Sequence, residues 1–232
     1  MRVSYPELQV LCERVLQAKG FPLGSVVEGA EMVVWAEVVG SQGLKKLVEK
    51  FDVLEKSQPK RIQIASESPH LTILDGAHQT DLLTARVAAD LAYSKATTNG
   101  VGVVEVINCQ GNDWVAQNAF QVAKRGISCM ISWDNYVAIA HPDTEHPRIM
   151  KKSEAQENSN SILVICSKSA YQEEAGQQVI REPHQIQERW DDAIGNGLEV
   201  DPDIWRKLVE KAREILVEST ELSRLKGTGE LA

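Results

Sequence analysis

A run of polar side chains from Asn108 to Asp113 carries several groups that could bind or transform a small molecule. The preceding run, Val101 to Ile107, is mostly Val and Ile, which predicts a strand covered on both faces. Loops that follow strands are where open α/β sheets place ligands. The amides of Asn108, Gln110 and Asn112 could donate hydrogen bonds to a carboxylate, and Asp113 could act as a base. An aspartate in this setting is more often a helix N-cap.

A second polar group is the turn Ser41-Gln42-Gly43, which falls between two predicted helices. Backbone amides at the start of a helix can hold an anion. The cations Lys45 and Lys46 follow this turn and could bind a carboxylate, although such short basic pairs are usually solvated. An ordinary turn between helices explains the pattern equally well.

The cysteines and histidines form no motif for metal binding or nucleophilic catalysis. Four widely spaced cysteines, Cys12, Cys109, Cys129 and Cys166, are expected to be buried free thiols. Cys109 directly follows the predicted strand, yet no histidine is placed locally to deprotonate it. The five histidines fall at predicted turns and loops; His141 and His146 only faintly suggest a metal pair, and we expect solvated loop histidines and no metal.

The block from Gly100 to Pro142 resembles a block of the malate/L-lactate dehydrogenase family that is unrelated to the Rossmann lactate dehydrogenases. That family pattern is a strand, N-S-N-H-F-G, a helix, a glycine turn, a strand and a closing A-P, and Gly111 stands where it has a histidine. The block Trp35 to Leu47 resembles A-D-x-x-G-x-x-S-H-G-x-x-R-L, with Gln42 in place of the second histidine. Over most of its length the chain resembles a short, functionally unassigned branch of the family.

The resemblance implies hydride transfer between NAD or NADP and a 2-oxo acid, a 2-hydroxy acid or a cyclic imino acid. Both expected histidines are replaced, the turn Val164 to Ser169 has Ile165 where the family has an acid, and the later G-W-x-x-D segment is missing. We therefore predict a shortened pseudo-enzyme that binds a small carboxylate or acts as an accessory protein. The alternative is an active NAD(P)-dependent oxidoreductase with substitute residues, for which the catalytic candidates are Gln42 and Asp113. The predicted ligand-binding residues are Ser41, Gln42, Lys45, Lys46, Asn108, Gln110, Asn112, Lys168 and Ser169.

Helices and strands that must position these residues can be read from periodicity and capping signals. We predict an α/β fold with a mixed sheet and crossover helices, a dehydrogenase-like, non-Rossmann core and an N-terminal helical segment. The predicted helices run from the Ser4 cap to Gly20, over 26–39, from residue 44, over 81–97 and 115–124, and from the Asp201 cap onward. The predicted strands are 61–66, 71–74, 101–107, 127–133, 137–140 and 162–166. We expect a single domain, divided into a helical segment (1–56), an α/β core (57–170) and a C-terminal helical segment (171–232).

Composition excludes some partners. With 232 residues, a net charge of -8 and a pI near 5.2, the chain is not expected to bind nucleic acid or anionic membrane. It has no apolar run of spanning length and no signal peptide, so we expect a cytoplasmic protein. The family resemblance implies a homodimer. A second polypeptide that supplies the missing histidine and aspartate is an alternative partner.

Overall fold

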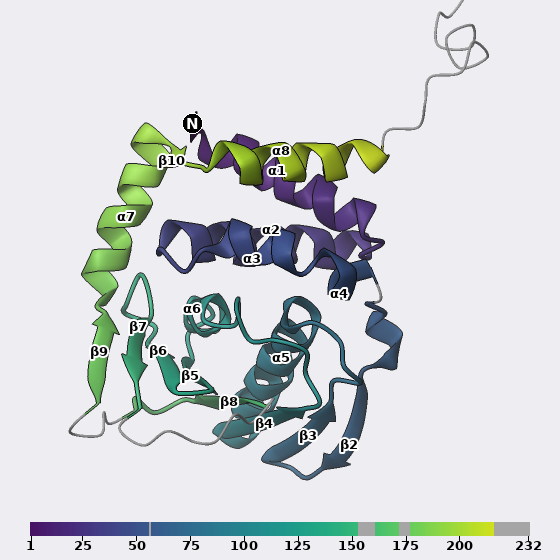
Figure 1. The fold of residues 1–232 in the computed structure, drawn as a ribbon. Helices are drawn as coiled ribbons and strands as arrows, with labels where there is room; N and C mark the ends of the chain where they lie inside the picture. Colours follow the sequence, from purple (N-terminus) through teal and green to yellow (C-terminus); the bar gives the residue numbers. More distant parts are fainter. Residues whose placement is uncertain (56, 153–160, 172–176, 216–232) are drawn as a thin grey trace, which may run out of the picture.

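The computed structural model describes residues 1–55, 57–152, 161–171 and 177–215. Residues 216–232, part of the predicted C-terminal helical segment, lie outside the described residues. In Figure 1 a layer of helices lies above a sheet, and two further helices lie between this layer and the strands. The predicted fold class is confirmed: the chain forms an α/β structure around a mixed sheet.

The helical layer is built from both ends of the chain. It contains α1 (Tyr5–Ala18), α2 (Leu23–Val38), α3 (Gly43–Glu49), the short α4 (Phe51–Glu55) and α8 (Pro202–Ala212), which lies alongside α1. The predicted capping box at the start of α1 is present: Ser4 Oγ accepts from Glu7 N at 3.4 Å, and Ser4 N donates to Glu7 Oε2 at 3.1 Å. The Asp201 cap of α8 is also confirmed. Helix α2 begins three residues before the predicted start, behind Pro22, which provides no side-chain cap.

The main sheet has eight strands in the described part of the chain, in the order β2-β3-β4-β8-β5-β6-β7-β9. Strands β3 and β4 are parallel, whereas the other neighbours are antiparallel. The two predicted strands 61–66 and 71–74 correspond to β2 and β3, which pair as an antiparallel hairpin. In sheet order the strands are β2 (Gln63–Glu67), β3 (Leu71–Asp75), β4 (Val101–Ile107), β8 (Ile162–Ser167), β5 (Ser128–Trp133), β6 (Tyr136–Ala140), β7 (Arg148–Lys151) and β9 (Gln178–Arg181).

Two crossover helices, α5 (Asp81–Asn99) and α6 (Gln117–Ala123), cover the face of the sheet that is turned toward the helical layer (Figure 1). Helix α5 connects the parallel pair β3 and β4, and α6 connects β4 to β5, with β8 inserted between those two strands. Gly100 ends α5 with a φ of +85°, as its position after Asn99 predicts.

Two predictions about burial are wrong. Strand β4 is not covered equally on both faces, because α5 packs on only one of them: Val104 and Val106 are fully buried, whereas Val103 and Ile107 are half-buried. Helical spacing on α5 also predicts that Val87 points inward with Leu82 and Leu91, but Val87 is 39% exposed. The buried face of that helix is formed by Leu82, Leu83 and alanines from Ala85 to Ala96.

Short elements at the ends of the sheet and of the chain escaped prediction. Strand β7 lies in a segment without hydrophobic periodicity, and β9 joins the sheet from the segment assigned to C-terminal helices. Too few residues pair in such edge strands to give a readable pattern. The other short elements are the pair β1 (Arg2–Val3) and β10 (Leu198–Glu199) and the 3-10 turns Pro59–Arg61 and Arg213–Ile215. Helix α7 (Pro183–Asn196) lies in the segment expected to be helical, but its bounds were not predicted.

One continuous apolar core joins the helical layer to the sheet, and it includes Leu8, Trp35, Leu82, Val104 and Ile131. A smaller cluster of Val137, Ile139 and Met150 lies apart from it. None of the helices in the described part of the chain has the length and apolar character that a membrane-spanning helix needs.

Candidate functional site

The site is formed where the loops after β3 and β4 meet. Because β3 and β4 are parallel, their carboxyl ends lie at the same edge of the sheet. Backbone hydrogen bonds join the loops: His78 N donates to Asn108 O at 2.8 Å, and Gln110 N donates to Gln79 O at 2.8 Å. Ala77, His78 and Asn108 have φ values of 47°, 58° and 54°, a left-handed conformation that costs free energy for non-glycine residues. The strained backbone is therefore concentrated at this edge.

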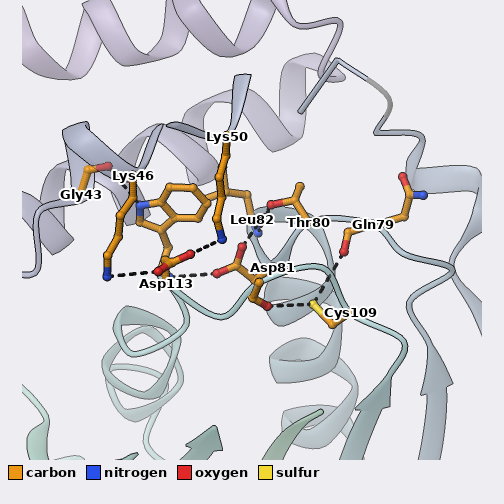
Figure 2. A network of polar contacts seen from close by, with 11 residues as sticks. Gly43, Lys46, Lys50, Gln79, Thr80, Asp81, Leu82, Cys109 and Asp113 are labelled. Carbon is orange, nitrogen blue, oxygen red and sulfur yellow. Dashed lines mark hydrogen bonds and ion pairs between the residues drawn. The ribbon is translucent and has the colours of Figure 1, made fainter. Parts of the chain in front are cut away.

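Asp113 forms ion pairs with Lys46 of α3 and with Lys50, the C-cap residue of that helix. Lys46 Nζ lies 3.1 Å from Asp113 Oδ1, and Lys50 Nζ contacts Asp113 Oδ2. Figure 2 shows the carboxylate between the two ammonium groups. The lysines are four residues apart and so project from the same side of α3. The three side chains keep 20–30% of their surface exposed, so the cluster is accessible from solvent.

The interpretation of Asp113 as a helix N-cap is wrong. Helix α6 begins only at Gln117, and its N-cap residue, Ala116, has no side-chain cap. Burial alone would raise the pKa of the Asp113 carboxyl. The hydrogen bond and charge of Lys50, together with those of Lys46, outweigh burial and hold this pKa below its ordinary value. Asp113 is therefore ionised at neutral pH.

Asp81 is the residue of this network that sequence reasoning missed. Its side chain is fully buried; one oxygen accepts from Trp114 N at 2.9 Å and the other from Thr80 Oγ1 at 3.1 Å. Burial raises the pKa of Asp81 to about 6, against the opposing charge of Lys50. The one available signal was the pair Thr80-Asp81 at a helix start, where Thr80 already supplies the cap of α5.

Gly111, which replaces the expected histidine, lies at the centre of these charged groups. Its φ of +93° is a conformation that side chains rarely adopt. A Cβ atom there would overlap Lys50 Nζ and would lie 3.5 Å from Asp81 Oδ1 and 3.6 Å from Asp113 Oδ2. The ammonium of Lys50 thus occupies the space in which a side chain at residue 111 would begin.

Cys109, in the loop after β4, is buried and its thiol stays protonated at neutral pH. Its thiol is 3% exposed, and Sγ lies 3.0 Å from Thr84 Oγ1 and 3.3 Å from Gly111 O. Burial, followed by the nearby charge of Asp81, raises the pKa of Cys109 to about 12. All four cysteines are free and buried, as predicted.

The other predicted residues of the turn and the loop lie around this network. Gln42 is the exposed N-cap residue of α3, in a left-handed conformation with a φ of 57°, and its side chain makes no cap hydrogen bond. Asn108 Nδ2 donates to Asp75 Oδ1 at 3.1 Å. Ser41 and Asn112 are half-buried, whereas Lys45 and Gln110 are exposed.

Lys168 and Ser169 are not brought to the site. Strand β8 is antiparallel to β4, so the turn after β8 lies beside the start of β4, at the opposite edge of the sheet. There Lys168 N donates to Gly100 O at 3.0 Å, and Lys168 Nζ donates to Thr97 O at 2.8 Å.

The histidines do not lie in this network. His141 is half-buried, and its Nδ1 lies 3.1 Å from Ser128 Oγ. His146 was expected to be solvated, but it is only 3% exposed, because it packs between Phe120 and Trp190. Among the residues that the structure describes, no group of three His, Cys, Asp or Glu side chains could hold a metal ion.

Another feature of the surface is a groove of about 530 Å³ between α1 and α8. It is lined by Val10, Arg14, Trp205 and Val209 among others, and none of its lining residues belongs to the predicted site. The charged network is therefore separate from this groove.

Comparison with known proteins identifies the family. A family model described as malate/L-lactate dehydrogenase matches residues 3–150. No curated protein matches the chain. Among solved structures, the fold is similar to malate dehydrogenase from Entamoeba histolytica (TM-score 0.72, 11% identity, 91% of this chain and 97% of that chain covered). It is also similar to sulfolactate dehydrogenase from Methanocaldococcus jannaschii (0.70, 16%, 92% and 97%) and to delta1-piperideine-2-carboxylate reductase from Pseudomonas syringae pvar. tomato (0.68, 13%, 91% and 99%).

At such low identities the solved structures establish a shared fold, whereas the family model matches the sequence itself over more than half of the chain. The charged network of Lys46, Lys50, Asp81 and Asp113 lies within the matched residues. The chain belongs to the malate/L-lactate dehydrogenase family.

Proposed function

We propose that the chain binds a small carboxylate through Lys46 and Lys50, and that it acts as a carboxylate-binding or accessory member of its family. The observation that carries this proposal is the convergence of both ammonium groups on Asp113 at a loop edge that solvent reaches. Asp113 is itself a carboxylate, so its position between the lysines marks a geometry that an external carboxylate can also use.

Hydrogen-bonding capacity leaves room for a ligand. The two ammonium groups face the ionised carboxylate of Asp113 and the buried carboxyl of Asp81, whose pKa is raised to about 6. Each ammonium has three N–H donors, and each of these lysines uses one of them on Asp113. The remaining donors can bind a second carboxylate, or the ligand can displace Asp113. Charge-assisted hydrogen bonds of this kind contribute about 1.5–3 kcal/mol each.

The same residues are poor at proton transfer. Reduction of a 2-oxo acid needs a group that delivers a proton to the developing alkoxide. Gln42 has no acidic proton at neutral pH, Gly111 has no side chain, and the lowered pKa of Asp113 keeps that carboxyl ionised. This deficit favours binding over catalysis.

The family implies NAD or NADP, and the network offers no fit for a dinucleotide. Phosphate groups need free backbone amides or cationic side chains. Here the backbone amides of Gly76, His78 and Gln110 are used between the two loops, so they are not free to hold a pyrophosphate. We therefore derive no hydride-transfer step at this site.

One observation favours a second candidate function, an NAD(P)-dependent oxidoreductase with substitute residues. Asp81 has a pKa raised to about 6 by burial, so it retains some protonated form near neutral pH. It lies 3.5 Å from the Cβ position at residue 111. Turnover of NADH with pyruvate or a cyclic imino acid, abolished by Asp81→Asn, would establish this function in place of the binding role.

The binding proposal is tested by calorimetric titration with L-malate and with pyruvate. Lys46→Gln and Lys50→Gln should each weaken binding about tenfold or more, because each removes a charge-assisted hydrogen bond. Lys207→Gln, which removes an exposed lysine from α8, is the matched control and should bind like the wild type. Absence of saturable binding to the wild type, or an equal loss in the control, would reject the proposal.

A further inference from the structure

Two arginines from separate elements converge where α2 ends. Arg181 is the last residue of β9, and Arg189 lies in the middle of α7. A Cβ atom on Gly40 would lie 2.8 Å from Arg189 Nη1 and 3.6 Å from Arg181 Nη2, so both guanidinium groups approach the same point. We propose that Arg181 and Arg189 form a binding site for an oxyanion, the phosphate or carboxylate group of a small molecule.

Neither arginine has a carboxylate partner within the described parts of the chain. No ion pair is formed by Arg181 or Arg189 with those residues. The acid next to Arg181, Glu182, accepts a hydrogen bond from Arg148 at 2.8 Å. Asp192, one turn along α7 from Arg189, accepts from Asn196 at 2.7 Å. Among the described residues, therefore, no ion pair neutralises either positive charge.

A role in capping the C-terminus of α2 accounts for the position of Arg181 but not for that of Arg189. Arg181 Nε donates to Val39 O at 3.3 Å, and Arg181 Nη1 donates to Ile180 O at 3.2 Å. A cation at a helix C-terminus is also favoured by the helix dipole. No hydrogen bond holds Arg189 in the described structure, although its guanidinium lies beside that of Arg181. Like charges in proximity repel, and an anion placed between them removes that repulsion.

Guanidinium groups are suited to ligands with two or more oxygens. Their planar arrangement of N–H donors matches carboxylate and phosphate oxygens in pairs. Arg181 is half-buried and fixed by its backbone contacts, whereas Arg189 is exposed and free to close on a ligand. Gly40, without a side chain, leaves room for the Arg189 guanidinium beside the backbone. The site therefore combines one fixed and one adjustable donor group.

This site is separate from the Lys46 cluster and does not depend on the function proposed for it. Gly40 immediately precedes Ser41 and Gln42, so the two cationic groups lie on either side of one short turn. The arginine pair can bind a ligand with one anionic group or with two. Separate titrations with inorganic phosphate, with a carboxylate and with a nucleotide therefore show which kind of anion binds.

The test is calorimetric titration at low ionic strength with inorganic phosphate, malonate, NADPH and NADH. The wild type should bind at least one of the first three saturably, and Arg189→Gln should weaken that binding about tenfold or more. Arg189→Lys should restore part of the affinity, because it restores the charge without the planar geometry. Tighter binding of NADPH than NADH, lost in Arg189→Gln, would identify a nucleotide phosphate as the anion.

Two controls make the result specific. Arg206→Gln removes an arginine that is 73% exposed on α8, and it should bind the probe like the wild type. Lys207→Gln, which removes an exposed lysine of α8 that belongs to neither site, should also leave phosphate binding intact. The inference is overturned if the wild type binds none of the probes, or if Arg206→Gln weakens binding as much as Arg189→Gln.

Discussion

Asp81 connects three parts of the site through one buried carboxyl. It accepts hydrogen bonds from Thr80 on its own helix and from Trp114 N on the loop after β4, and the charge of Lys50 on α3 acts on it. A buried carboxylate without these partners would be far more costly. Asp81 therefore holds the loop that carries Asp113 in place. The free energy needed to bury Asp81 depends on whether its carboxyl is ionised.

Asp81→Asn should change how stability depends on pH. In the unfolded chain Asp81 loses its proton near its ordinary pKa of 3.8, whereas in the folded chain burial raises that pKa to about 6. Between these values the folded state holds the additional proton, so this group lowers the free energy of unfolding as pH rises, by about 3 kcal/mol in total. Urea unfolding from about pH 4 to about pH 7 should show the fall in the wild type but not in Asp81→Asn. Profiles that run parallel would contradict the raised pKa.

At the residue level, the sequence pointed to the polar loop and to Lys46, but not to their partners. Lys46 was predicted from its place after the turn Ser41-Gln42-Gly43, and Asp113 from its place in the loop after a predicted strand. Their ion pair, and the participation of Lys50 and Asp81, depend on contacts across more than thirty residues, as the separation of 63 between Lys50 and Asp113 illustrates. Lys168 was misplaced because the direction of β8 in the sheet cannot be read from its composition.

Helix α3 must approach α2 closely to hold its lysines over the loop, and Gly43 permits that approach. A Cβ atom there would overlap Val33 O and would lie 2.8 Å from Glu37 N and 3.1 Å from Ala36 Cβ. The carbonyl of Gly43 also accepts from Trp114 Nε1 at 3.4 Å, which links α3 to the loop after β4.

Gly43→Ala should therefore lower the free energy of unfolding by about 1–3 kcal/mol through overpacking, and it should weaken carboxylate binding because α3 shifts. Gly195→Ala is the matched control: a Cβ on this α7 residue meets nothing within 4 Å. That change should be neutral or stabilising by up to about 1 kcal/mol. Urea unfolding of both variants checks the prediction, and equal losses would show that the close crossing is unimportant.

Helices with strong local signals were predictable, and short paired elements were not. The Ser4 box, the Gly100 termination and the Asp201 cap each act within a few residues, so the chain itself encodes them. Strands β7 and β9 are defined by pairing with partners distant in sequence. The burial of β4 was predicted wrongly because it too depends on distant parts of the chain. A run of valines does not show whether helices cover one face of the sheet or both.

At the scale of the molecule, the Lys–Asp113 cluster is a contact between the two layers. Lys46 and Lys50 belong to the helical layer, whereas Asp113 follows a strand of the sheet (Figures 1 and 2). An external carboxylate that replaces Asp113 would therefore bind at the junction of the layers. Binding there should stabilise the folded state by mass action.

Titration of Asp113→Asn with L-malate tests the central claim most directly, because this change removes the internal carboxylate and keeps both lysines. If Lys46 and Lys50 bind external carboxylates, the variant should bind L-malate more tightly than the wild type, since no internal anion competes for the ammonium groups. The retained fold is checked by its circular dichroism spectrum. Unchanged or weaker binding by a folded Asp113→Asn would contradict the account of this site.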